Sequence, residues 1–253
     1  MANRLLSKMQ RMLMPSPVKA RHIEYSMLYS EDDAVSRPSP RLIDLAVETI
    51  RQTQLIPDLE DISKRTDGRL TYGRKRLSLW PGEHYKLLAG LVKVLRPLRV
   101  VEIGTAEGLS ALTLLKYLPE EGSVLTFDVV RWNRYPNSCL QQSDFDSGKL
   151  VQLVADLGDA DTFQAYRDTL IKADLVFIDA AKDGFLERRL IGHFEKLNYE
   201  SDPIFVFDDI RLWNMLHVWR DLSWPKLDLT SFGHWCGTGI AEAPSIKPRG
   251  HWC

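Results

Sequence analysis

The chain has 253 residues, of which 44% are hydrophobic and 26% charged, and its 33 Lys and Arg nearly balance its 34 Asp and Glu. This composition excludes a disordered, collagen-like or coiled-coil protein, and the net charge of -1 gives no general reason to expect a nucleic-acid partner. Cys139, Cys236 and Cys253 cannot form a disulfide framework, and no apolar run approaches the ~20 residues of a membrane span. We therefore expect a cytoplasmic protein.

Residues 1–21 contain basic side chains and no acidic one, and Leu5, Met9 and Leu13 would lie on one face of a helix. Such a helix is typical of a membrane-surface segment or a targeting peptide. The alternative, which we favour because short amphipathic patterns are weak evidence, is an arm that packs on the protein body or on a second subunit.

Helical periodicity appears over residues 41–54 and again over residues 82–95, where Pro97 ends the second helix. The stretch between the two helices is polar and has little pattern. We therefore expect residues 1–75 to form an N-terminal arm with a helical lid or oligomerisation segment, and residues 76–253 to form a separate domain.

Five short apolar runs then alternate with helical stretches. They span residues 99–103, 123–129, 150–155, 175–179 and 204–208. Such runs are typical of parallel strands covered on both faces, with helices as right-handed crossovers. Residues 226–232 and 237–242 are predicted to form an antiparallel hairpin with a short turn. The predicted α/β fold is a doubly wound, mostly parallel seven-stranded sheet with an antiparallel C-terminal hairpin and an N-terminal helical extension.

Ligands of such sheets lie beyond the carboxyl ends of the strands, so the residues that end each run are the candidates for function. Gly104 and Gly108 permit a tight turn and close approach of a ligand to the backbone. A dinucleotide fingerprint would require glycine at 106 and 109, where this chain has Ala106 and Leu109. A ligand without phosphates is therefore favoured.

The second and third runs end in further candidates for a nucleoside site. Asp128 is positioned to accept the hydroxyls of a ribose, and Asp156 and Leu157 are positioned to contact adenine. The alternative for each aspartate is a turn or helix cap, with Asp156 and Asp159 capping a helix that starts near Thr162.

Asp179 ends the fourth run, and Asp208 and Asp209 end the fifth. Carboxylates at the ends of adjacent strands repel one another unless they are protonated or neutralised, and a divalent cation such as Mg²⁺ is the natural partner. Lys182 could reach the same site as a general base if burial or the cation lowers its pKa; the alternative is a solvent-exposed lysine.

The tetrapeptide Gly-His-Trp-Cys occurs at residues 233–236 and again at 250–253. Two His and Cys pairs could hold a soft metal, but we favour chance repetition in a Trp-rich tail.

Over residues 78–242, these motifs resemble the class I S-adenosylmethionine-dependent methyltransferases, most closely the cation-dependent O-methyltransferases of the catechol and caffeoyl-CoA type. The segment from Glu102 to Ser110 matches the Glu-x-Gly-x-x-x-Gly-x-Ser loop of that family. Residues 179–185 resemble its Asp-x-x-Lys-Asp-x-aromatic signature. The resemblance implies a Rossmann-like methyltransferase fold and a reaction that moves the methyl group of S-adenosylmethionine to a hydroxyl of a small molecule.

The resemblance also implies a role for each candidate residue. The implied cofactor-binding residues are Glu102, Gly104, Ser110, Asp128, Asp156, Leu157 and Asp179; the metal ligands are Asp179, Asp208 and Asp209; and the catalytic base is Lys182. The metal, expected to be Mg²⁺, would chelate two neighbouring oxygens of the acceptor. Because members of the family are often dimers, we expect a homodimer.

Departures from the family pattern leave the acceptor open. Asp209 replaces the usual Asn, as in sugar O-methyltransferases of macrolide pathways, and Ala180 and Ala181 replace bulkier residues. The loop at residues 131–149 has no counterpart and either lines the acceptor pocket or covers the sheet. The alternative functions are a metal-independent methyltransferase, a nucleotide-dependent oxidoreductase and a non-catalytic binding module.

Overall fold

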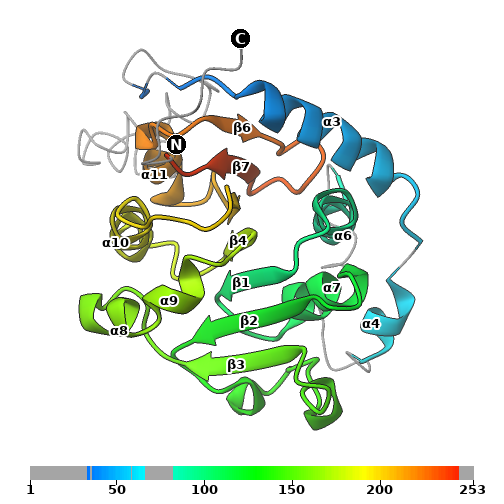
Figure 1. The fold of residues 1–253 in the computed structure, drawn as a ribbon. Helices are drawn as coiled ribbons and strands as arrows, with labels where there is room; N and C mark the ends of the chain where they lie inside the picture. The colour runs from blue at the N-terminus through cyan, green and yellow to red at the C-terminus, as the bar shows by residue number, and fades with distance from the viewer. Residues whose placement is uncertain (1–32, 35, 58, 66–81, 245–253) are drawn as a thin grey trace, which may run out of the picture. The chain divides into compact units, whose positions relative to one another are not determined.

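The computed structural model describes residues 33–34, 36–57, 59–65 and 82–244 (Figure 1). The compact unit that contains the sheet begins at Ser36. The predicted basic helix at residues 1–21, the second Gly-His-Trp-Cys segment and the predicted domain boundary near residue 75 lie outside the described residues. The division into an arm and a separate domain therefore stays a prediction.

Seven strands form one sheet in the order β3-β2-β1-β4-β5-β7-β6. They are β1 (Arg99–Ile103), β2 (Ser123–Asp128), β3 (Leu150–Val154), β4 (Leu175–Ile178), β5 (Ile204–Asp208), β6 (Lys226–Asp228) and β7 (Thr238–Glu242). The first five strands are parallel, whereas β7 is antiparallel to both β5 and β6. The predicted mostly parallel sheet with an antiparallel hairpin at one edge is confirmed (Figure 1).

Helices cover both faces of the sheet, as the apolar runs predict. They are α3 (Pro40–Thr53), α4 (Glu60–Arg65), α6 (His84–Leu95), α7 (Leu109–Tyr117), α8 (Ala160–Ala165), α9 (Arg167–Leu170), α10 (Phe185–Phe194) and α11 (Met215–Asp221). Successive strand residues point to opposite faces, so Val100 and Val206 pack with α3, α4, α6 and α7, while Val101 and Phe207 pack with α8 to α11. Among the described helices, none combines the length and hydropathy that crossing a membrane requires.

The register of the parallel strands brings their carboxyl ends to one edge. Ile103 on β1 aligns with Phe127 on β2 and with Ile178 on β4, which in turn aligns with Phe207 on β5. The strand order reverses between β1 and β4, because β1 leads outward to β2 and β3 before the chain crosses to β4. Residues that follow these strands therefore gather at the place where open α/β sheets bind ligands.

Helix α6 begins at His84, two residues later than predicted, because Gly82 and Glu83 contact the loop before β7. The N–H groups of Gly82 and Glu83 donate to the carbonyls of Gly233 and Phe232, so these residues hold the loop before β7 instead of starting the helix. A side chain at position 82 would overlap the Phe232 backbone at 2.1 Å, which only glycine avoids. The contact places His84, the first residue of α6, beside that loop.

The predicted short turn of the C-terminal hairpin is wrong. Strand β6 ends at Asp228, whose side chain accepts the Thr230 N–H at 2.8 Å and turns the chain out of the sheet. Strand β7 does not begin until Thr238. The connection between them is a loop over residues 229–237, and it carries His234 and Cys236 to the carboxyl edge of the sheet.

Candidate active site at the carboxyl edge of the sheet

A cavity of about 240 Å³ lies at the carboxyl ends of β1, β2, β3 and β4. Five of the predicted cofactor-binding residues line it, namely Gly104, Asp128, Asp156, Leu157 and Asp179. The same cavity is also lined by Tyr135 and Leu186. The strand-end residues that the sequence singled out thus line one open pocket.

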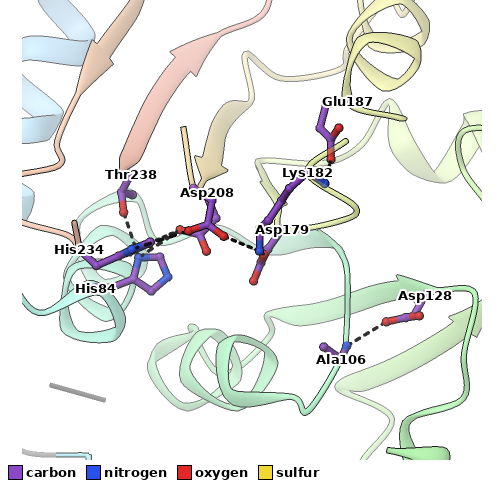
Figure 2. Close-up of polar contacts among 10 residues, drawn as sticks. His84, Ala106, Asp128, Asp179, Lys182, Glu187, Asp208, His234 and Thr238 are labelled. Atoms are coloured by element: carbon purple, nitrogen blue, oxygen red, sulfur yellow. Dashed lines mark hydrogen bonds and ion pairs between the residues drawn. The ribbon is translucent and has the colours of Figure 1, made fainter. Parts of the chain in front are cut away.

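The glycine loop after β1 forms one wall of the cavity. Gly104 has a φ of 104°, and a Cβ on it would lie 1.8 Å from the carbonyl oxygen of Asp179, so only glycine lets the loops after β1 and β4 come this close. Ala106 is also left-handed, with a φ of 42°, and its N–H donates to Asp128 Oδ2 at 2.9 Å (Figure 2). This hydrogen bond ties the glycine loop to the end of β2.

Asp128 holds a turn and also faces the cavity, so its predicted contact with a ribose stays a prediction. Its Oδ1 accepts the Val130 N–H at 2.9 Å, and the Tyr135 hydroxyl donates to Oδ1 and Oδ2 at 3.2 and 3.3 Å. Burial and the neighbouring Asp128 raise the pKa of Tyr135, so its hydroxyl stays a donor.

Tyr135 belongs to the loop at residues 131–149, which mainly covers the sheet. Trp132 stacks on Phe145 with ring centroids 5.4 Å apart, and the Trp132 N–H donates to Gln152 on β3 at 2.9 Å. These contacts support the predicted role of covering the sheet, and Tyr135 also lines the cavity. The other predicted role, lining the acceptor pocket, stays a prediction.

Asp159 caps a helix, whereas Asp156 holds a turn and faces the cavity. Asp159 caps α8 by accepting the Thr162 N–H at 2.9 Å. Asp156 accepts the Gly158 N–H at 2.8 Å and lines the cavity together with Leu157, so it remains a candidate for contact with a base.

Glu102 and Ser110 lie behind the cavity wall rather than on it. Glu102 is wholly buried, and its carboxylate oxygens have no hydrogen-bond partner among the described residues. Burial raises the pKa of Glu102 to about 8, although the nearby hydroxyls of Ser110 and Thr126 partly offset this effect. The cofactor role of Glu102 stays a prediction.

Asp179, Asp208 and Asp209 form a carboxylate cluster, as the strand register predicts. One carboxylate oxygen from each lies within 4.8 Å of the others, although Asp179 follows β4 while Asp208 and Asp209 come from the end of β5. Burial and repulsion by Asp208 raise the pKa of Asp179 to about 7. Asp209 adopts a left-handed φ of 55°, a strained conformation that turns its side chain toward the cluster.

Lys182 lies between two of these carboxylates. Its Nζ is 2.6 Å from Asp179 Oδ1 and 2.5 Å from Asp209 Oδ2. Burial lowers the pKa of Lys182, but the two carboxylates more than offset this and raise it above its ordinary value. Burial alone therefore does not lower the net pKa of Lys182, and a lowering by a bound cation stays a prediction.

Glu187, which the sequence did not single out, fixes the loop that carries Lys182. Glu187 is wholly buried on α10, and its two oxygens accept the N–H groups of Lys182 at 2.7 Å and of Gly184 at 2.9 Å (Figure 2). Lys182 itself has a left-handed φ of 59°. The two hydrogen bonds hold that strained backbone and so aim the ammonium at the cluster.

His84 and His234, the imidazole pair, lie on the other side of Asp208 (Figure 2). His234 Nε2 is 2.7 Å from Asp208 Oδ1, and His84 Nδ1 is 3.6 Å from the same oxygen. Burial lowers the pKa of His84 to about 4. For His234, burial is the largest single effect and lowers the pKa, but the hydrogen bond to Asp208 together with the charges of Asp208, Asp209 and Asp179 raises it overall. For Asp208, the imidazoles and Lys182 outweigh burial and lower the pKa.

Sequence reasoning missed His84 and dismissed His234. His84 sits in an apolar helix whose pattern indicates only a core residue. His234 and Cys236 belong to the first Gly-His-Trp-Cys segment, which we attributed to chance, yet ligand atoms of His234, Cys236 and Asp209 lie within 4.8 Å of one another. The repeat was the available signal, and its position between the last two predicted strands pointed to the carboxyl edge.

Comparisons with known proteins identify the family and the fold. An O-methyltransferase family model matches residues 59–214, whereas no curated protein matches the chain. The solved O-methyltransferase TomG of Streptomyces achromogenes, involved in tomaymycin synthesis and in complex with SAM, is 17% identical over 79% of this chain and 96% of its own, with a TM-score of 0.51. A methyltransferase of Geobacter sulfurreducens is 13% identical over 84% and 100%, with a TM-score of 0.52.

The O-methyltransferase of Bacillus cereus in complex with SAH is 18% identical over 79% of this chain and 97% of its own, with a TM-score of 0.52. At these identities the solved structures establish a shared fold. The family model covers more than half of the chain and confirms the resemblance predicted from the sequence. The chain therefore belongs to the O-methyltransferase family.

Proposed function

We propose that this O-methyltransferase takes its methyl group from S-adenosylmethionine and transfers it to a hydroxyl of a small molecule bound beside the carboxylate cluster. The observation that carries the proposal is the position of Asp179, which lines the cavity and also belongs to the cluster. A donor in the cavity would thus present its reactive end to an acceptor at the cluster.

The cavity suits the nucleoside part of this donor. Asp128 offers a carboxylate to a ribose, and Asp156 and Leu157 offer an acceptor and an apolar surface to adenine. Its volume of about 240 Å³ is just below the ~300 Å³ at the lower end of ligand pockets, which suits a nucleoside better than a dinucleotide. Ala106 and Leu109 depart from the dinucleotide fingerprint and support the same choice.

Lys182 is the proposed proton acceptor. S-adenosylmethionine supplies a methyl group already activated on a sulfonium sulfur, so the protein must mainly hold the acceptor oxygen about 3 Å from that carbon and remove its proton. Lys182 Nζ lies at the junction of the cavity and the cluster, within hydrogen-bond distance of Asp179. It can take the proton only as a neutral amine, so its ion pairs with Asp179 and Asp209 must be relieved first.

A divalent cation at the carboxylate cluster would relieve them. Asp179, Asp208 and Asp209 offer three oxygen ligands, which suit Mg²⁺. Burial first, and repulsion by Asp208 and Asp209 second, raise the pKa of Asp179. A bound cation would lower the pKa of an acceptor hydroxyl and align two neighbouring oxygens. To ligate through all three carboxylates, the ion must displace the Lys182 ammonium, which frees the lysine to act as the base.

Isothermal titration calorimetry tests the choice of donor. S-adenosylhomocysteine should bind the full chain, NAD should not, and Asp128→Ala should weaken the binding by roughly 10- to 100-fold, since it removes charge-assisted hydrogen bonds. Binding of NAD in place of S-adenosylhomocysteine would establish the oxidoreductase alternative.

Chelation tests the role of the cation. Prolonged EDTA treatment or Asp208→Ala should abolish transfer to vicinal diols while S-adenosylhomocysteine still binds. Full transfer by metal-free protein would instead establish the metal-independent methyltransferase.

A further inference from the structure

The imidazole pair and Asp208 bring together a second set of metal-binding atoms that the family resemblance does not imply. One ligand atom each from His84, Asp208 and His234 lies within 4.8 Å of the others. The three residues come from α6, β5 and the loop before β7, and all three are buried. Nitrogen donors of this kind suit transition metals rather than Mg²⁺.

The spacing of the donor atoms is close to that of a metal site. In a tetrahedral Zn²⁺ site with bonds near 2.1 Å, neighbouring donor atoms lie about 3.4 Å apart. Asp208 Oδ1 is 2.7 Å from His234 Nε2 and 3.6 Å from His84 Nδ1. Shifts of less than about 1 Å would therefore bring both pairs to the spacing that a bound ion requires.

The charge distribution also favours this half of the cluster. The Lys182 ammonium already pairs with Asp179 and Asp209, so an ion held by all three carboxylates must expel it. An ion held by His84, Asp208 and His234 replaces the contact between Asp208 and His234 and leaves both ion pairs of Lys182 in place.

The surroundings hold the two imidazoles in position. The rings pack edge to face with centroids 4.7 Å apart. His84 Nδ1 also lies 3.1 Å from Thr238 Oγ1 on β7, and an ion bound at this nitrogen would replace that hydrogen bond. The backbone contacts of Gly82 and Glu83 with the loop before β7 fix the two segments to each other. Such preorganisation reduces the cost of gathering ligands from distant parts of the chain.

We propose that His84, Asp208 and His234 bind a divalent transition-metal ion, so that this chain prefers Zn²⁺ or Co²⁺ to Mg²⁺. The inference goes beyond the proposed function: an ion held here leaves Lys182 paired with Asp179 and Asp209, so it is not the ion that would free Lys182 to act as the base. It places the ion beside the carboxylate cluster, with Asp208 as the shared ligand.

The test is titration of metal-free full-length chain with Co²⁺, followed by visible absorption, with Mg²⁺ as competitor. Co²⁺ should bind and resist displacement by excess Mg²⁺. His84→Ala and His234→Ala should each weaken Co²⁺ binding by at least about 100-fold, the upper end of what loss of an outer-shell partner costs. Asp179→Asn should change the affinity far less, because only a neighbouring charge is lost.

Two control variants separate this site from other histidines. His217→Ala removes an exposed histidine on α11, and His251→Ala removes the histidine of the second Gly-His-Trp-Cys segment. Neither variant should alter the binding of Co²⁺ by His84, Asp208 and His234. Loss of binding in His251→Ala, with His84→Ala unaffected, would overturn the proposal.

Anomalous diffraction from Zn²⁺-soaked crystals locates the ion in the wild-type chain and so does not depend on whether a buried-histidine variant folds. A peak among His84, Asp208 and His234 is the expected result. A peak among the three carboxylates without an imidazole, or no bound ion, would overturn the inference. Calorimetry with S-adenosylhomocysteine on the same protein tests the methyl donor separately, so failure of either proposal is recognised by itself.

Discussion

The cavity and the carboxylate cluster share Asp179 but are stabilised in different ways. Around the cavity, Asp128 and Asp156 accept hydrogen bonds from backbone N–H groups of their own turns and of the glycine loop. In the cluster, side chains from three separate segments neutralise one another, with Lys182 on one side of the aspartates and His234 on the other.

The difference indicates which property each region controls. A cavity shaped by backbone hydrogen bonds is formed before its ligand arrives, so changes there should act mainly on donor affinity. A cluster held by opposing charges can exchange one cation for another, so changes there should act mainly on the rate of transfer. Substitutions in each region test whether the cavity controls donor affinity and the cluster controls the rate of transfer.

Lys182→Met should have the largest effect. Loss of the proton acceptor is expected to slow transfer to vicinal diols by about 10²- to 10⁴-fold, the usual contribution of general base catalysis. Affinity for S-adenosylhomocysteine should stay within a few-fold of wild type, because Lys182 does not line the cavity. Radiolabelled methyl transfer and calorimetry measure the two quantities.

The matched control is Lys196→Met, which removes an exposed lysine and should leave both quantities unchanged. A loss of donor affinity in Lys182→Met as large as the loss of rate would erase the distinction between the two regions.

Gly104→Ala should disturb both regions at once, because Gly104 is where they touch. The added methyl would overlap the Asp179 carbonyl and occupy a positive φ, which together should cost about 3 kcal/mol in the free energy of unfolding. Urea denaturation gives the stability, and weaker S-adenosylhomocysteine binding is expected with it.

Gly192→Ala is the control, since Gly192 lies in α10 with open space around it. It should be neutral or stabilise by about 0.5–1 kcal/mol. Equal stability of the two alanine variants would contradict the close contact between the loops after β1 and β4.

Glu187→Ala should act on the cluster through the Lys182 backbone. Removing the acceptor of two buried N–H groups is expected to cost about 1–3 kcal/mol and to slow transfer more than it weakens donor binding. Glu187→Gln keeps one carbonyl acceptor and should restore part of both losses. A stability loss without any change in transfer rate would limit Glu187 to a structural role.

Tyr135→Phe should have the smallest effect, and only on the cavity side. Its hydrogen bonds to Asp128 are long, at 3.2 and 3.3 Å, so their loss is expected to cost about 0.5–1 kcal/mol, or roughly two- to five-fold in S-adenosylhomocysteine affinity. The transfer rate at saturating donor should not change. A slower rate at unchanged affinity would place Tyr135 with the acceptor instead.

The five cofactor-binding residues that line the cavity were predictable from the sequence because each lies at or just after the end of an apolar strand, and parallel strands bring their carboxyl ends to one edge. The carboxylate cluster followed from the same rule. The two histidines beside Asp208 could not be predicted from this rule, because His84 starts a helix and His234 lies in a loop that we had taken for a short turn. Glu187 was missed because its function depends on the left-handed backbone at Lys182, which no residue type at that position indicates.

The crystal structure of the chain with S-adenosylhomocysteine and a divalent cation tests the central claim most directly. The account predicts the ribose on Asp128, the adenine beside Asp156 and Leu157, and the sulfur directed past Asp179 toward Lys182. A nucleoside outside the cavity, or a sulfur directed away from the carboxylate cluster, would contradict it.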